Sequence, residues 1–130
     1  MEEKKVIKEF VQKTLGCGCP EEVFKIIDYK DNVPCGNLII RRKINIGNRL
    51  LVYIFDLTEN MIIKEIIPLL LKSGKEERDK YGFNRFRLVL AVSNAGSIEK
   101  TIFDLFNKIN TDDKIHLHII EKVYMKQFKV

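Results

Sequence analysis

The sequence has no tryptophan, three prolines, three cysteines and two histidines, so residue types that often carry chemistry are scarce. No apolar run approaches the roughly 18–20 residues that span a bilayer, and we therefore expect no transmembrane helix. The first ten residues, MEEKKVIKEF, are charged and amphipathic, without the uninterrupted apolar stretch of a signal peptide. These absences predict a cytoplasmic protein with no membrane partner.

The composition is that of a globular protein. The 130 residues are 45% hydrophobic and 32% charged, which predicts one domain over 1–130 with a real core and excludes intrinsic disorder. Abundant lysine and glutamate resemble the composition of hyperthermophile proteins, although an AT-rich genome produces the same bias. The net charge of +5 is too small for the dense basic surface typical of nucleic-acid binding, so no nucleic-acid partner is expected.

The first part of the chain predicts a helix followed by irregular structure. Residues 2–15 place apolar side chains at helical spacing, and Gly16 suits the left-handed position that ends many helices. A short strand, or a helix that turns into a strand, is expected over 23–30. Residues 31–36 combine Asp, Asn, Pro and Gly, which favour a loop.

The middle of the chain predicts an antiparallel β-hairpin over about 37–57. Its two apolar strands are joined by Gly47-Asn48, a pair that favours a tight turn with positive φ angles. A helix is expected over 59–73, with a kink or a break at Pro68, because proline cannot donate the helical hydrogen bond.

The second half predicts parallel strands joined by helices. Strands are expected over 85–93 and 114–120, with an amphipathic helix between them. With the second hairpin strand they form a βαβαβ unit over about 49–120, whose crossovers should be right-handed. The expected fold is therefore a single, three-layer-like α/β domain, in which a mixed sheet joins the hairpin to this unit, plus an N-terminal helix.

The cysteines give the most distinctive chemical signal. Cys17 and Cys19 form a C-x-C within the segment GCGCP, and Cys35 lies between a proline and a glycine. Gly18 leaves room for both sulfurs to approach one ion, so the three thiolates are candidate ligands for zinc, copper(I) or an iron–sulfur cluster. The C-x-C pair is equally a candidate redox pair. The alternative is that both residues fill a tight turn, since cysteine is a small, often buried residue.

Both histidines lie in one expected strand. His116 and His118 alternate with apolar residues in IHLHI, so both imidazoles should share one face of the sheet. Together with Cys17 and Cys19 they would complete a tetrahedral zinc site, if the chain brought the two segments together. The alternative is a pair of half-exposed histidines without a ligand.

Polar residues follow two of the expected parallel strands, at the edge where α/β sheets bind ligands. The candidates for binding Mg²⁺ or a phosphate there are Asp56, Ser93, Asn94, Gly96 and Ser97. The order FDLT then VSN resembles the first two motifs of haloacid-dehalogenase-type phosphatases, but Thr58 stands where that family has a second aspartate. The alternative is that Thr58 and Ser97 simply cap helices.

Four basic residues occupy alternate positions on two expected strands, and they would form a basic stripe able to contact phosphates if those strands aligned. They are Arg41, Lys43, Arg85 and Arg87. The alternative is that these residues are simply charged side chains on the outer faces of a sheet. No RNA-binding motif accompanies them.

Three functions remain open. The first is binding of a soft metal or cluster, or cycling of thiols, through the GCGCP turn, together with a partner protein. The second is a non-catalytic interaction or assembly module that uses its amphipathic termini for protein contacts or self-association. The third is a phosphate-handling enzyme that uses Asp56 and the loop 93–97. No complete catalytic motif is present, which favours a protein that is not an enzyme.

Overall fold

The computed structural model describes residues 2–16, 20–58 and 60–125. At its centre is one five-stranded sheet with the strand order β1-β2-β3-β4-β5. Its strands are β1 (Ile27–Cys35), β2 (Leu38–Ile46), β3 (Leu50–Asp56), β4 (Arg85–Val92) and β5 (Ile115–Glu121).

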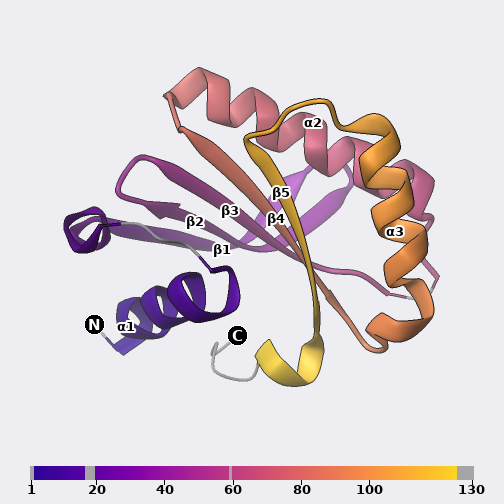
Figure 1. Ribbon diagram of the computed structural model, residues 1–130, viewed down its shortest axis with the longest axis horizontal. Coiled ribbons are helices and arrows are strands. Elements are labelled where there is room, and N and C mark those ends of the chain that lie inside the picture. The colour runs from indigo at the N-terminus through magenta and orange to yellow at the C-terminus, as the bar shows by residue number, and fades with distance from the viewer. Residues whose placement is uncertain (1, 17–19, 59, 126–130) are drawn as a thin grey trace.

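Helices cover both faces of this sheet (Figure 1). One face carries α1 (Glu2–Glu9), which continues into a π-helical turn, η1 (Phe10–Thr14), and then a 3-10 turn, η2 (Glu21–Lys25). The other face carries α2 (Ile63–Tyr81) and α3 (Ala95–Ile109). A last 3-10 turn, η3 (Lys122–Met125), follows β5. The predicted α/β fold with an N-terminal helix is therefore confirmed.

The sheet is mixed, as the sequence predicted. Strands β1, β2 and β3 pair antiparallel, whereas β3, β4 and β5 pair parallel, with α2 and α3 as the crossovers. The β2–β3 turn has positive φ at both Gly47 (61°) and Asn48 (57°), which is the backbone shape expected from this pair. The hairpin and the βαβαβ unit are both present.

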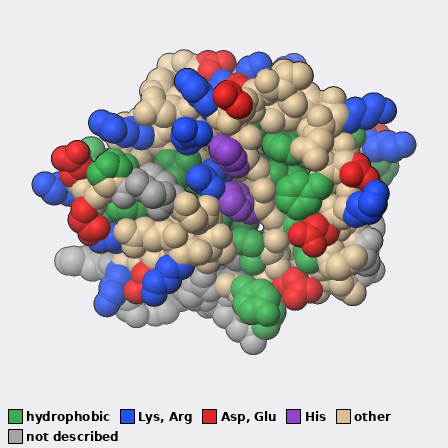
Figure 2. All heavy atoms as spheres, viewed as in Figure 1, with side chains coloured by type: hydrophobic (Ala, Val, Ile, Leu, Met, Phe, Trp, Pro, Cys, Tyr) green, Lys and Arg blue, Asp and Glu red, His purple; other side chains and the backbone are tan. Residues whose placement is uncertain are grey.

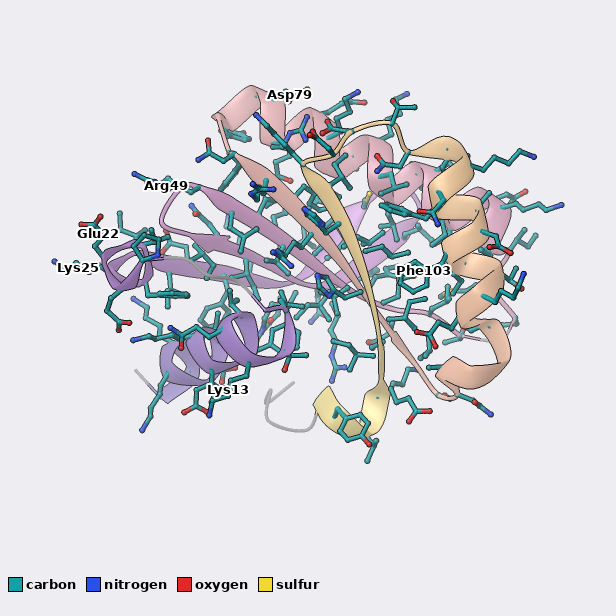
Figure 3. The ribbon with its side chains drawn as sticks, viewed as in Figure 1. Lys13, Glu22, Lys25, Arg49, Asp79 and Phe103 are labelled. Carbon is teal, nitrogen blue, oxygen red and sulfur yellow. The ribbon has the colours of Figure 1, made fainter. Side chains whose placement is uncertain are left out.

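Two apolar cores lie on the two faces of the sheet. The larger one packs α2 and α3 against side chains such as Tyr53, Phe86 and Leu88. Phe103 of α3 points toward this face of the sheet, whereas Lys13 lies on the outer side of the N-terminal helix (Figure 3). The smaller core packs the N-terminal helix against the opposite face. The apolar stripe of that helix is thus covered by the sheet rather than exposed for a partner.

The predicted loop over 31–36 is wrong, because β1 continues through this segment to Cys35. Asn32 takes a positive φ of 55° within the strand, and Pro34 is tolerated because β1 lies at the edge of the sheet that the described residues form. Gly16 has a φ of 68°, as expected for the residue that ends the first helix.

The second helix begins later and ends later than predicted. Its N-cap position is Ile62, and the hydroxyl of Thr58 donates to Asn60 Oδ1 (2.6 Å) instead of capping α2. The helix runs through Pro68 without a break and continues to Tyr81. Gly82 ends it with a φ of 75°.

Arg42 is a charged residue within the smaller core, with 2% of its surface exposed. Its Nε donates to Asp31 Oδ1 (2.6 Å), and its Nη1 contacts Glu3 of α1. Burial lowers the pKa of Arg42, but the two carboxylates raise it by more, so the guanidinium stays charged. These two contacts link β2 to β1 and to α1.

None of the helices in the described part of the chain has the length and apolar character needed to cross a membrane.

Candidate functional site

Four nitrogen-bearing side chains meet on the face of the sheet that carries α1. Apolar residues of β4 and β5 point into the larger core, so the alternate positions Arg85, Arg87, His116 and His118 point the other way. Strand register places Arg87 opposite His116. Figure 2 shows both histidines at the surface with Lys and Arg side chains beside them. We call these four residues the Arg–His cluster.

Arg87 is the centre of this cluster. Its Nη1 lies 2.9 Å from Nε2 of His118 and donates to the backbone carbonyl of Leu15 at 2.7 Å. A guanidinium can only donate, so Nε2 of His118 is the acceptor and its proton sits on Nδ1. Arg85 Nη1 lies 3.5 Å from Nε2 of His116, which makes a second, longer contact between the same two strands.

The cluster holds unbalanced positive charge. Within the described ranges, no carboxylate forms an ion pair with Arg85 or Arg87. Burial lowers the pKa of Arg87, and the charge of Arg85 lowers it further. Burial and the charge of Arg87 also lower the pKa of His118, to about 4. Both effects disfavour additional positive charge at this place.

The pKa of His116 is also lowered. Burial, Arg87 and Arg85 lower its pKa, and only Asp113 acts to raise it. Both imidazoles are therefore neutral at physiological pH, and the two guanidinium groups carry the whole charge of the cluster.

We expect His118 to stay neutral down to about pH 4, which an NMR titration of the two imidazoles can measure. The unfolded chain takes up this proton near the ordinary value of about 6.5. The stability that neutral His118 contributes is therefore full above pH 6.5 and is lost as the pH falls toward 4. Arg87→Met removes the repelling cation and should move the midpoint of His118 upward. An ordinary midpoint in the wild type would contradict this geometry.

The predicted cysteine site is only partly within the described residues. Cys17 and Cys19 lie outside them. Cys35 is buried in the larger core, on the side of the sheet that carries α2 and α3. The two histidines face the opposite side, as does Leu15, which precedes Cys17 by two residues and belongs to the smaller core. The structure therefore does not bring Cys35 together with the histidines. In the part of the chain that is described, no three His, Cys, Asp or Glu side chains form a group suited to a metal ion.

The residues predicted to bind Mg²⁺ or a phosphate at the strand ends lie in different environments. Ser93 and Asn94 line a cleft of about 260 Å³ whose other walls are mainly apolar, including Leu57 and Met61. Asp56 is not among the lining residues, and its Oδ1 accepts a hydrogen bond from Arg41 Nη1 (3.1 Å).

The first turn of α3 contains both remaining candidates, Gly96 and Ser97, because this helix begins at Ala95. Ser97 therefore does not occupy the N-cap position, which belongs to Asn94. The backbone N–H of Ala95 donates to Glu121 Oε2 (3.3 Å). A carboxylate at this helix terminus would repel a phosphate, so the geometry gives the phosphate-enzyme hypothesis little support.

The predicted basic stripe does not form. Strand β3 separates β2 from β4, and Lys43 reaches Glu77 of α2 (3.0 Å), on the opposite side of the sheet from Arg87. Arg41 pairs with Asp56, which lies in register with Ala91 and so about 13 Å along β4 from Arg87. Arg41 and Lys43 are thus paired with acids, whereas Arg85 and Arg87 have no acidic partner among the described residues.

A partly buried network of polar side chains on the α2 side was not predicted from the sequence. The hydroxyl of Tyr53 donates to Glu77 Oε1 (2.5 Å), and Lys43 donates to the other carboxylate oxygen (3.1 Å). Burial and the neighbouring Glu77 raise the pKa of Tyr53, which keeps the phenol protonated. Lys43 and Glu77 border a groove of about 630 Å³ that also includes Tyr81. The sequence signal was present only as a tyrosine within an otherwise apolar strand.

Comparisons with protein-family models, with curated proteins and with solved structures find no match to this chain.

Proposed function

We propose that the protein acts in thiol–disulfide exchange through Cys17 and Cys19, together with a partner protein. The observation that carries the proposal is the hydrogen bond from Arg87 to the carbonyl of Leu15. Cys17 follows Leu15 by two residues, so covalent connectivity limits how far it can lie from the Arg–His cluster.

Unbalanced positive charge is the environment that activates a thiol. The thiolate is the reactive form of cysteine, and nearby Arg or Lys residues lower the thiol pKa from about 8.5. Arg87 also has a buried Nε with no acceptor in the described part of the chain. A negative group near this guanidinium would relieve the cost of burying it unpaired, which is about 1–3 kcal/mol for such a donor.

The chemistry needs only a disulfide as the oxidant. One thiolate of the pair attacks a sulfur of the substrate disulfide, which forms a mixed disulfide and releases the other substrate sulfur as a thiolate. The second cysteine, deprotonated to a thiolate, then attacks the mixed disulfide and releases the second substrate thiolate. The substrate is reduced by two electrons, and Cys17 and Cys19 are oxidised to one disulfide. Free thiols of this kind fit a reducing, cytoplasmic setting.

Binding of zinc or an iron–sulfur cluster by the same cysteines is the competing function. Two positive charges disfavour a cation nearby, and Nε2 of His118 already accepts a hydrogen bond from Arg87. These two features favour thiol cycling over a metal site that uses the histidines.

The test is oxidation of anaerobically purified, metal-analysed protein with glutathione disulfide, followed by mass spectrometry. We expect metal-free protein that forms an internal Cys17–Cys19 disulfide. The variants Cys17→Ser and Cys19→Ser should each form only a mixed disulfide with glutathione or fail to react. Cys35→Ser should behave like the wild type because Cys35 is buried. Bound zinc or iron that is lost in either of the first two variants would replace this proposal with a metal site. If all three thiols react equally slowly with glutathione disulfide and the protein holds no metal, both the thiol-exchange proposal and the metal site would be refuted.

A further inference from the structure

Among the described residues, some Arg and Lys side chains of this protein form ion pairs with carboxylates, and others do not. Arg41 pairs with Asp56, Arg42 with Asp31 and Glu3, Arg78 with Asp79 and Asp112, and Lys43 with Glu77. Arg85 and Arg87 have neutral histidines as their side-chain neighbours instead. The fold therefore keeps two adjacent guanidinium groups without a negative charge among the described residues.

The four side chains form a two-by-two array. Residues two apart on one strand lie about 7 Å from each other, and adjacent strands are about 4.8 Å apart, so the array spans the dimensions of a small oxyanion. Arg85 is exposed, whereas Arg87, His116 and His118 are half-buried. Hydrogen bonds from partly buried guanidinium groups are stronger than those of fully hydrated ones, because the surroundings are less polar than water.

We propose that the Arg–His cluster is a binding site for a phosphate group, either free phosphate or the phosphate of a small monoester. Two permanent charges match the dianion of a phosphate monoester better than the single charge of a carboxylate. Guanidinium groups also have the planar fork of donors that suits phosphate oxygens, and neutral imidazoles can add N–H donors. The same charges repel metal cations.

This site goes beyond the proposed thiol function, because it needs none of the cysteines. The two can therefore fail separately. A Cys17→Ser/Cys19→Ser double variant should lose disulfide exchange and keep phosphate binding. A protein with ordinary thiols can still bind phosphate at the cluster.

The experiment is isothermal titration of the full chain with inorganic phosphate, glycerol phosphate and acetate at pH 7.5 and low salt. We expect saturable binding of one phosphate per chain, and binding of acetate at least tenfold weaker. Arg85→Met is the first test variant, because Arg85 is exposed and its loss should leave the fold intact. It should weaken phosphate binding about tenfold or more.

Arg41→Met is the matched control, since it makes the same chemical change at a guanidinium that is already paired with Asp56. It should bind phosphate like the wild type. Tighter binding of glycerol phosphate would identify a phosphorylated small molecule as the ligand, and tighter binding of inorganic phosphate would identify the free ion. No saturable binding, equal affinity for acetate, or equal weakening by Arg41→Met would each overturn the proposal.

Discussion

Gly74→Ala is expected to destabilise the protein by up to about 2 kcal/mol, although the same change stabilises most exposed helices. Gly74 lies in α2, and a Cβ added there would overlap the ring atoms of Phe86. Phe86 is fully buried in the larger core and its ring packs edge-on against Tyr53, so a shift of the ring would disturb other core side chains. The gain in helix propensity is about 1 kcal/mol, which is smaller than the cost of the overlap.

Urea denaturation of Gly74→Ala and Phe86→Leu, alone and combined, measures this contact. The double variant should be more stable than the sum of the single effects predicts, because the smaller side chain makes room for the new methyl group. Stabilisation by Gly74→Ala in the wild-type background would contradict the close packing of α2 on β4.

Local sequence patterns predicted the central part of the fold well. Gly47-Asn48 between two apolar runs identified the β2–β3 turn, and the alternation of apolar segments identified the parallel unit. The same patterns failed at β1, where Asn32 and Pro34 indicate a loop. An edge strand accepts both residues because one of its sides makes no ladder hydrogen bonds, and edge position depends on the whole sheet.

The candidate site was predicted in pieces rather than as a unit. The alternation in IHLHI placed His116 and His118 on one face, and the positions of Arg85 and Arg87 placed them together as well. Which helix covers that face, and which acids reach each cation, depends on tertiary packing that no local pattern contains. The role of Arg87 as the link to Leu15 could be found only from the structure.

Arg87→Met is expected to raise the thiol pKa of the C-x-C pair by about one unit, a tenfold loss of thiolate at neutral pH. The physical reason is the removal of a half-buried positive charge that has no carboxylate partner in the described part of the chain. Arg85→Met should act in the same direction with a smaller effect, because Arg85 is exposed to solvent and screened by it.

The most direct measurement is the pH dependence of alkylation of Cys17 and Cys19 by iodoacetamide, read by mass spectrometry in a Cys35→Ser background. We expect thiol pKa values well below the ordinary value of about 8.5 in this background, higher values in Arg87→Met, and no change in the control Arg41→Met. Thermal unfolding of each variant verifies that the fold is kept. Thiols that titrate near 8.5 in all three proteins would contradict the claim that the Arg–His cluster activates them.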